Sequence, residues 1–379
     1  MVQTSHNYSI QVSCDQYDAR WDQFVASCRG GHHEQTSLWV QFKFNYYGWE
    51  PIRIIVSRNG VIYGGVQILK RRLKWFGNIG YVTRGPLSIS EDPELLNVIV
   101  AALDNAAKHA RLKYLAVIPS YTGHHFVPLL EKLNFMPKPD FLPPSAVMRA
   151  TLVLDLAEDI DKLMERMRRN LQRDLRRALS SGLVFREGAE NDIETFRRLM
   201  WALCERRGCA PSPPQKDFFH NLWKVLHAHG HLKLFLVEFD KTPVSAVITF
   251  PFGDTVRLWK IGWNGEHEKL RPNALLYWEV IKWSKQNGYR YFDFVWIDLD
   301  SANKLHRGEA IQPDNTNGMS FFKIGFGGQV ILLPEQYLKF YNRLVQLLFR
   351  FGGRQLLASK WGTGIIRRIY HSNASADAG

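Results

Sequence analysis

Two stretches, Lys108-His-Ala-Arg-Leu-Lys-Tyr114 and Lys285-Gln-Asn-Gly-Tyr-Arg-Tyr291, decide the fold of this chain. Both join a predicted helix to a predicted apolar strand, with similar spacing of basic and aromatic residues. The elements around them also come in the same order: a hairpin, then a helix, then a strand. An internal duplication of one α/β unit is the economical explanation. We therefore expect two domains of mixed α/β structure.

The same signals predict the elements of each copy. In the first copy, strands at residues 52–57 and 61–69 flank Asn59-Gly60, which is a strong hairpin signal. A helix at about 93–110 then leads to a strand at 114–118. The second copy has corresponding elements at residues 232–239, 244–250, 273–287 and 291–295.

The boundary between the copies falls where prolines are frequent, at positions 137, 139, 143 and 144. Proline disfavours long regular elements, so we predict domain 1 over residues 1–150 and domain 2 over 151–330. Residues 331–379 form a basic, broadly apolar segment that we expect to be helical and to pack back on domain 1. An amphipathic basic segment can also lie on an anionic membrane surface, and this alternative stays open.

Size and charge limit the classes of function. The chain has 379 residues, 45% of them hydrophobic, which excludes a largely disordered protein. Lysine and arginine number 49 against 36 acidic residues, for a net charge of +13. Such an excess favours polyanionic partners, although solubility alone can also explain it. The four cysteines match no common zinc spacing, and the start has no secretory signal pattern, so we expect a cytoplasmic protein that contacts membranes only peripherally.

Residues 159–181 carry apolar residues at helical spacing, with Gly182 after them as a stop signal. We predict a single amphipathic helix. Its polar faces are rich in arginine, which indicates either an ordinary solvated surface or a stripe that binds phosphates. The arginines proposed for polyanion binding are Arg169, Arg173, Arg176 and Arg177.

The run Gly318-Met-Ser-Phe-Phe-Lys-Ile-Gly-Phe-Gly-Gly328 places Lys323 between aromatic residues and a glycine cluster. Glycine lets a ligand approach the backbone closely, and a lysine held beside such a path is a candidate charge stabiliser. The alternative is a strand followed by a glycine-rich turn, with Lys323 exposed to solvent.

Taken together, ordered landmarks along residues 35–335 resemble the FemABX family of non-ribosomal aminoacyl and peptidyl transferases. Each motif is modest alone, and their order is the more specific signal. The motifs are Ser37-Leu-Trp-Val-Gln-Phe-Lys43 with Gly48-Trp49, Gly64-Gly-Val-Gln-Ile-Leu69, Gly80-Tyr-Val-Thr-Arg-Gly-Pro86, Arg169-Asn-Leu-Gln-Arg-Asp-Leu-Arg-Arg-Ala178, Arg206-Arg-Gly208, Pro272-Asn273, Tyr291-Phe-Asp293 and Phe322-Lys-Ile-Gly-Phe-Gly-Gly328.

This resemblance implies two tandem GNAT-like domains, the acyl-CoA N-acyltransferase fold, in the α/β (α+β) class. It also implies peptidoglycan biosynthesis and hence cell-wall biogenesis and cell shape. By this resemblance, aminoacyl-tRNA would be the donor, and the acceptor would be a muropeptide precursor linked to a nucleotide or to a lipid. No cofactor would be needed. A monomer is expected. The long helical arm that some members insert into the second domain has no room here, so tRNA docking through such an arm is not implied.

Residue by residue, the resemblance implies that Lys323, with Phe322 before it, matches the catalytic lysine of the family. Lys43 and Arg206 match positions associated with binding the phosphates of the nucleotide-muropeptide, and Trp39 lies in the same motif as Lys43. Arg84 is a further candidate in the substrate groove. Its alternative role is to support the turn at Gly85-Pro86.

Aminoacyl esters are already activated, so transfer to an amine requires positioning, loss of a proton and a cation facing the developing oxyanion. Lys323 is the candidate cation. Asp293 and Asp298 follow a predicted strand, where an acidic group could accept the proton, and of the two Asp293 is the candidate base. Capping of the loop backbone is the alternative role for both residues, and the acceptor amine can also lose its proton unaided.

Two other functions stay open. One is an acyl-CoA-dependent N-acyltransferase that acts on an exopolysaccharide or lipid-linked sugar, although no clean pyrophosphate-binding loop precedes a helix. The other is a non-catalytic RNA-binding protein. No metal site is expected: His227-Ala-His-Gly-His231 has no carboxylate or thiol at ligand spacing, and the pairs His32-His33 and His124-His125 give no better case.

Overall fold

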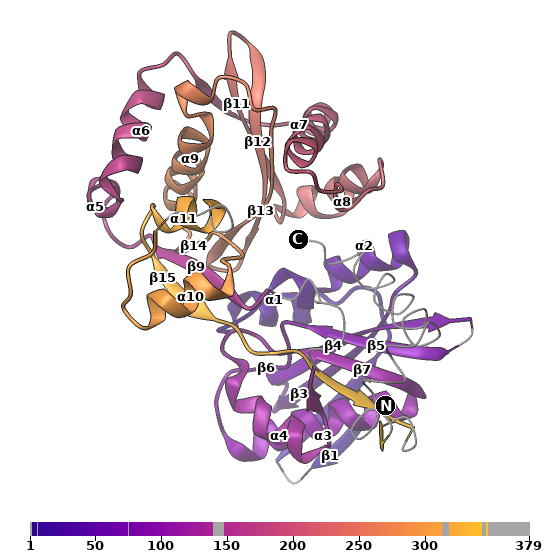
Figure 1. The fold of residues 1–379 in the computed structure, drawn as a ribbon. Helices are drawn as coiled ribbons and strands as arrows, with labels where there is room; N and C mark the ends of the chain where they lie inside the picture. Colours follow the sequence, from indigo (N-terminus) through magenta and orange to yellow (C-terminus); the bar gives the residue numbers. More distant parts are fainter. Residues whose placement is uncertain are drawn as a thin grey trace. The chain divides into compact units, whose positions relative to one another are not determined.

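The computed structural model describes residues 2–5, 7–74, 76–138, 148–312, 318–342 and 346–347. The chain divides into two compact units: residues 1–147 with those from 334 onward, and residues 148–333. Each unit holds a mixed sheet with helices on its faces (Figure 1). The two halves of the sequence thus build two α/β units of the tandem GNAT-like kind.

The first unit is built on a sheet whose strand order is β1-β2-β3-β4-β5-β7-β16-β8, with β6 paired to β4. Its strands are β1 (Val2–Ser5), β2 (Tyr8–Ser13), β3 (Glu50–Arg58), β4 (Val61–Leu73), β5 (Gly77–Thr83), β6 (Leu87–Ser88), β7 (Leu112–Ile118), β8 (Met136–Pro137) and β16 (Tyr337–Phe340). Its α-helices are α1 (Ala19–Ser27), α2 (Ser37–Tyr47), α3 (Pro93–His109) and α4 (Val127–Lys132).

Local sequence explains the main elements of this unit. Asn59 and Gly60 both have left-handed backbones, with φ of 51° and 79°, and so turn β3 tightly into β4. Helix α3 begins at Pro93 behind the Asp92 cap, whose side chain accepts from the Glu94 amide. Its apolar face, including Leu103, packs into the core with the strands. The hairpin and helix predicted from sequence are confirmed.

The second unit has the strand order β10-β11-β12-β13-β14-β9-β15. Its strands are β9 (Ala150–Asp155), β10 (Val184–Glu187), β11 (Lys233–Phe239), β12 (Thr242–Phe252), β13 (Thr255–Trp263), β14 (Tyr291–Asp293) and β15 (Gln329–Leu332). Its α-helices are α5 (Ile160–Arg166), α6 (Arg169–Leu179), α7 (Ile193–Arg206), α8 (Phe218–Leu226), α9 (Pro272–Gln286), α10 (Leu299–His306) and α11 (Gly318–Ile324).

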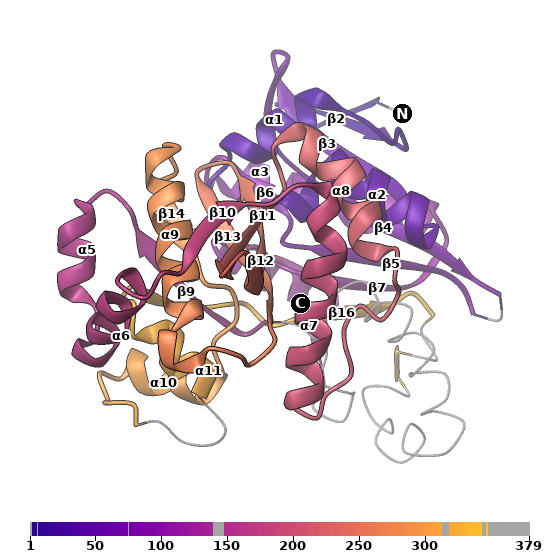
Figure 2. The same ribbon diagram turned by 90° about the horizontal axis from the view of Figure 1, so that it is seen from above.

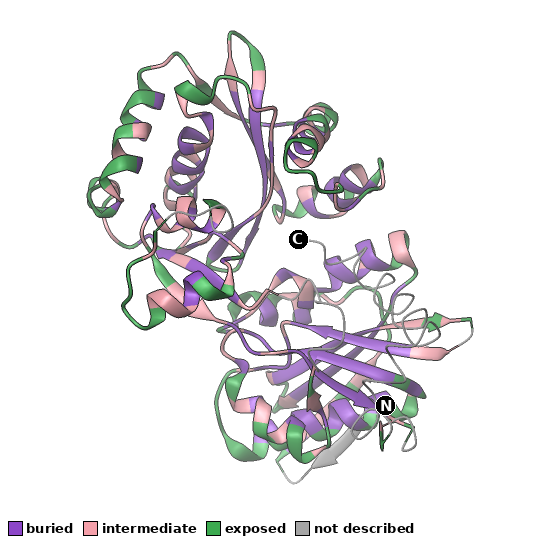
Figure 3. Ribbon diagram, viewed as in Figure 1, coloured by how far each residue is buried: buried purple, intermediate pink, exposed green. Residues whose placement is uncertain are grey.

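The helices of the second unit form layers on both faces of its sheet. Helix α9 covers one face with α6 outside it, and α7 and α8 cover the other, as both views show (Figures 1 and 2). Burial follows these layers: most residues of α9 are buried, while the outer face of α6 is exposed (Figure 3). The apolar core therefore lies between α9 and the strands.

One strand of the first sheet comes from beyond the second unit in the sequence. Strand β9 opens the second unit and pairs there with β14 and β15. Strand β16 follows β15, yet it pairs with β7 and β8 in the first sheet. The second unit is therefore one continuous stretch of sequence, whereas the first unit is completed by a strand encoded after the second.

The prediction of a single helix over residues 159–181 is wrong, because the chain forms α5 and α6 with a break at Met167 and Arg168. Tertiary contacts compete with the helix here. The Arg168 amide donates to the Gly325 carbonyl at 2.8 Å, and its guanidinium donates to the Phe321 carbonyl at 3.1 Å. The break leaves the Met167 carbonyl without a helical partner. The side-chain amide of Gln172 donates to this carbonyl at 2.7 Å.

The prediction of a helix after residue 331 is wrong over its first part, since residues 337–340 form β16, which is buried between β7 and β8. An open position in the sheet outweighs the helical spacing of these apolar residues. Pro143-Pro144 and the basic residues Arg354, Arg367 and Arg368 lie outside the described residues. Among the described helices, none is both long and apolar enough to cross a bilayer.

Candidate active site

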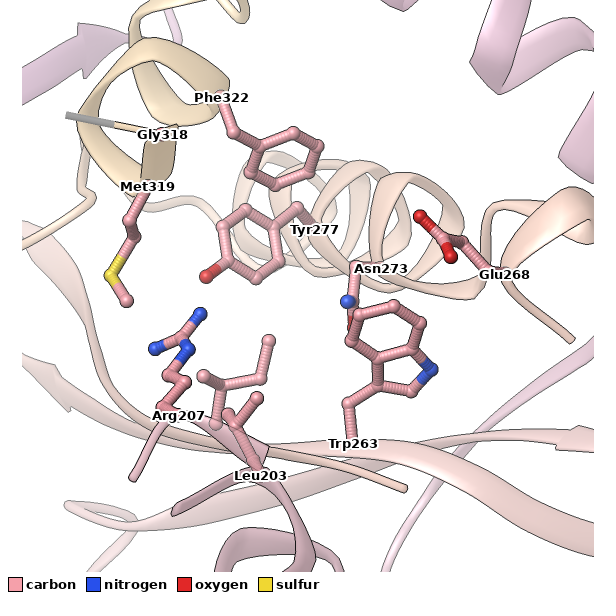
Figure 4. A pocket seen from close by; sticks show the side chains of 10 residues that line it. Leu203, Arg207, Trp263, Glu268, Asn273, Tyr277, Gly318, Met319 and Phe322 are labelled. Carbon is pink, nitrogen blue, oxygen red and sulfur yellow. The ribbon is translucent and has the colours of Figure 1, made fainter. Parts of the chain in front are cut away.

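A cavity of about 350 Å³ opens in the second unit. It lies between the C-terminal end of α7, strand β13, the start of α9 and helix α11 (Figure 4). Aromatic and apolar side chains make most of its wall, with a few polar groups among them, which is the usual composition of a small-ligand site. The lining residues are Leu203, Arg207, Ile261, Trp263, Glu268, Asn273, Tyr277, Gly318, Met319 and Phe322.

Tyr277 contributes a polar group to this cavity from the core helix α9. Its hydroxyl points toward the space between Met319 and Arg207 (Figure 4), although only 2% of the residue is exposed. Burial raises the pKa of Tyr277, so the hydroxyl keeps its proton at neutral pH. A buried neutral hydroxyl that faces a cavity can donate to an oxygen of a bound molecule.

Lys323 lies on α11 and is only 4% exposed. Its Nζ donates to the backbone carbonyls of Val295 at 2.8 Å and Trp296 at 2.9 Å. The alternative of an exposed lysine on a strand is therefore wrong. Phe322 of α11 and Phe326 just after the helix pack on each other and on Tyr277, which anchors this end of the helix to the core.

Burial lowers the pKa of Lys323 from its ordinary value of 10.5 to about 7. Nearby Asp293 opposes this shift, whereas Arg207 adds to it. A lysine in this range exchanges its proton near neutral pH, which is a property typical of functional sites. Phe322 lines the cavity, whereas Lys323 is directed toward the end of β14.

The backbone that Lys323 holds is a bulge after β14. The Phe294 amide donates to the Leu152 carbonyl at 2.9 Å, and the next bond across the ladder runs from the Ile297 amide to the Ala150 carbonyl at 3.1 Å. The segment from Phe294 to Ile297 is thus one residue longer than the facing part of β9. Val295 and Trp296 accommodate the extra residue in left-handed conformations, with φ of 52° and 36°.

Asp293 also acts on this bulge. Its Oδ1 accepts from the Val295 amide at 2.8 Å and from the Thr151 hydroxyl. Its Oδ2 lies 3.9 Å from Nε of Arg257. These contacts suit the loop-supporting role, and they leave base catalysis by Asp293 as a prediction only. Asp298 caps α10 by accepting from the Ser301 amide at 2.8 Å.

Arg206 and Arg207 end helix α7 side by side, but they face different neighbours. The Arg206 guanidinium lies 4.3 Å from the centre of the Trp263 ring, whereas Arg207 lines the cavity. The site analysis from sequence singled out Arg206 and missed Arg207, together with Trp263, Tyr277 and Met319. The motifs Arg206-Arg-Gly208 and Pro272-Asn273 contain two of the residues that line the cavity. The lining side chains of β13 and the interior of α9 belong to no motif, so the sequence alone did not indicate them.

The remaining predicted substrate contacts lie in the first unit. Lys43 on α2 is 2% exposed, and its Nζ lies over the rings of Trp39 at 4.8 Å and Tyr47 at 5.6 Å. Trp39 is 3% exposed. Arg84 has a left-handed backbone, with φ of 52°, just before the cis peptide Gly85-Pro86. Substrate binding by these three residues stays a prediction.

The arginine stripe lies on the outer face of α6. Arg169, Arg173, Arg176 and Arg177 are all exposed, while Leu171 and Leu175 on the opposite face are buried. Asp174 is paired with Arg271, at 3.2 Å between Oδ1 and Nε. The stripe is therefore accessible to a polyanion, as the phosphate-binding hypothesis requires.

The sequence predicts no metal site at the histidines, and their surroundings in the structure are as follows. His227 stacks on Trp223 with ring centres 3.8 Å apart, and its Nδ1 lies 3.1 Å from the Leu232 carbonyl oxygen, so it has a structural role. Adjacent residues His32, His33 and Glu34 bring possible ligand atoms within 4.8 Å of one another. Their rings also pack together and on Trp39.

Comparisons with known proteins agree with this architecture. The model of the acetyltransferase (GNAT) domain family matches residues 165–301. The lipid II:glycine glycyltransferase of Staphylococcus aureus (strain USA300) is 26% identical over 304 residues, which cover 77% of this chain and 66% of that protein. The protein of the same name from strain MRSA252 is 27% identical over 230 residues, covering 58% and 53%. The chain thus spans less than two thirds of the length of either relative.

Among solved structures, FemX superimposes with a TM-score of 0.76 at 18% identity, covering 89% of this chain and 99% of FemX. The C-terminal domain (DUF2156) of a putative lysylphosphatidylglycerol synthetase from Agrobacterium fabrum gives a TM-score of 0.51 at 13% identity, covering 87% and 93%. These likenesses concern the fold. With the two GNAT-like units, the glycyltransferase relatives and the ordered motifs from Lys43 to Lys323, they support the resemblance to the FemABX family.

Proposed function

We propose that this protein is an aminoacyltransferase of peptidoglycan biosynthesis. It would transfer an amino acid from an aminoacyl-tRNA to an amine of a lipid-linked or nucleotide-linked muropeptide. The observation that carries this proposal is Lys323, a buried lysine held at the bulge after β14, next to the cavity-lining Phe322. The names of the glycyltransferase relatives support the class of reaction and a lipid-linked acceptor.

The proposed step forms one bond and breaks another. The acceptor nitrogen attacks the ester carbonyl carbon, and the bond from that carbon to the ribose oxygen then breaks. The amine proton leaves on the departing ribose oxygen or to water. Charge develops on the carbonyl oxygen, and stabilising it is where the protein can lower the barrier most.

Lys323 can provide that stabilisation when it is protonated. An ammonium has three N–H donors, and two of them are directed at the Val295 and Trp296 carbonyls. The third remains for the developing oxyanion. The two carbonyls also fix the direction of the ammonium, so little reorganisation is needed during reaction.

The polyanionic substrates agree with the charge of the chain. A tRNA and a pyrophosphate-linked muropeptide are both strongly negative, and the chain carries +13 with an exposed arginine stripe on α6. In this proposal the protein acts in the cytoplasm. It contacts peripherally an anionic membrane that carries the lipid-linked acceptor.

The test incubates the purified protein with a labelled aminoacyl-tRNA pool and with either a lipid-linked or a nucleotide-linked muropeptide. We expect a labelled muropeptide with one amino acid added, and its loss in Lys323→Ala. The matched control is Lys132→Ala, since Lys132 ends the corresponding helix α4 in the first unit but is exposed. No product from the unaltered protein with any of these pairs would reject the proposal. Product from an acyl-CoA instead would establish the acyl-CoA alternative.

A further inference from the structure

Trp296 stands out among the residues around Lys323. It is 43% exposed, whereas its neighbours Phe294 and Ile297 are 0% and 1% exposed. The extra residue of the bulge after β14 interrupts the alternation of the strand and directs this side chain outward. A tryptophan combines a large apolar ring with a polar N–H, which suits it to contact a ligand at the surface.

The backbone under Trp296 is strained. Two successive non-glycine residues, Val295 and Trp296, have φ of 52° and 36°, a conformation that costs free energy for any residue with a side chain. Val295 is β-branched, which makes the left-handed conformation less favourable still. Strain of this kind persists only where surrounding contacts enforce it, and it concentrates at functional sites.

Several contacts enforce this conformation. Lys323 donates to both strained carbonyls, at 2.8 and 2.9 Å. The Val295 amide donates to Asp293 at 2.8 Å, and the Trp296 amide lies 3.0 Å from the sulfur of Met148. The backbone N–H and C=O groups of the bulge are thus held from several sides, while the indole ring itself stays at the surface. This arrangement fixes the backbone from which the Trp296 side chain projects to the surface.

We propose that Trp296 is the stacking platform for the terminal base of the RNA donor, an inference that rests on the proposed function. Base–aromatic stacking requires an aromatic ring that a base can reach, and Trp296 is exposed. The Lys323 ammonium lies 5.8 Å from the centre of the Trp296 ring. The 3′-terminal adenine of a tRNA is attached to the ribose that carries the aminoacyl ester. A base stacked on Trp296 therefore brings the reacting ester into the neighbourhood of Lys323.

The test measures binding of the trinucleotide CpCpA to the full-length protein without any acceptor. The chain contains 12 tryptophans, so the protein is labelled with 5-fluorotryptophan, and the ¹⁹F resonance absent from Trp296→Phe identifies Trp296. We expect CpCpA to shift this resonance, whereas CpCp with an abasic 3′ sugar does not. We also expect Trp296→Ala to weaken CpCpA binding about 5- to 150-fold, the range for loss of one stacked base, and Trp296→Phe to retain most of it.

The matched control is Leu299→Ala, because Leu299 is 39% exposed and lies three residues further along the chain. It should bind CpCpA as the unaltered protein does. The inference is overturned if CpCpA leaves the Trp296 resonance unmoved, or if Trp296→Ala binds CpCpA and the abasic trinucleotide as the unaltered protein does. Because no acceptor is present, base stacking and muropeptide transfer can fail separately.

Discussion

The two units of this chain carry a similar short sequence but place its lysine differently. Lys132-Leu-Asn-Phe135 begins with the last residue of α4 in the first unit, and Lys323-Ile-Gly-Phe326 begins in the last turn of α11 in the second. Both phenylalanines are buried, at 3% and 0% exposure. Lys132 is exposed to solvent, however, whereas Lys323 is buried and bonded to two carbonyls.

Of these two lysines, only Lys323 has backbone carbonyls of described residues placed to accept from its ammonium, and the two differ in exposure accordingly. In the second unit the strand before the helix ends in a bulge whose carbonyls turn toward Lys323. In the first unit no residue from 118 to 122 after β7 has a positive φ. The two units thus share a similar arrangement of elements, while the strained turn that binds a buried lysine is found in the second unit. The first unit uses its buried charges to hold its C-terminal strand.

The largest effect on stability is expected in the first unit, at Asp104. This buried carboxylate accepts from Lys339 of β16 at 2.6 Å and from the Tyr341 hydroxyl at 2.9 Å. Asp104→Ala leaves the Lys339 ammonium buried without its counter-charge, and we expect a loss of about 3–5 kcal/mol in the free energy of unfolding. Denaturant unfolding would measure it. Lys108→Ala is the control, because it removes only an exposed partner of Asp104 and should cost less than about 1 kcal/mol.

The largest effect on activity is expected in the second unit. Lys323→Ala should lower the single-turnover transfer rate about 10²- to 10³-fold, with little change in donor binding, since its ammonium acts on the transition state. Lys132→Ala should react at the unaltered rate. Equal loss in both variants would show that the two units contribute alike and would break the comparison.

The pH dependence of stability should separate the same two lysines. With a pKa of about 7 in the folded state against 10.5 ordinarily, Lys323 is deprotonated on folding between these values, so the unfolded state binds more protons there. Relative to Lys323→Met, the unaltered protein should gain stability as pH rises from 7 toward 10.5, by at most about 1.4 kcal/mol per pH unit. Lys132→Met should show no such slope difference in urea unfolding, and a flat difference for Lys323 would contradict the burial of its charge.

The smallest effect is expected on the surface of α6 in the second unit. Arg173 and Arg177 are exposed and four residues apart, so they share one face of the helix. The double change Arg173→Gln with Arg177→Gln should reduce the salt dependence of tRNA binding, lowering the log–log slope by about 2 if both contact phosphates. Lys108→Gln on α3 serves as the control. An unchanged slope would show that the stripe is only a solvated surface.

Local sequence was enough for the elements that depend on neighbouring residues. Asn59-Gly60 predicted the first hairpin, and the apolar spacing after Pro93 and Pro272 predicted the two core helices, because turn geometry and helix periodicity act over a few residues. The ordered motifs indicated the duplicated fold and singled out Lys323. They could not show whether that lysine is buried, because exposure depends on groups far away in the sequence.

Only the tertiary structure decided the rest. The return of β16 to the first sheet, the break at Met167 and Arg168, and the bulge that directs Trp296 outward all depend on partners more than a hundred residues distant. In each case a long-range hydrogen bond or an open sheet position outweighs a local preference of about 1 kcal/mol or less per residue. The sequence thus determined the repeated scaffold, and long-range packing determined where its two copies differ.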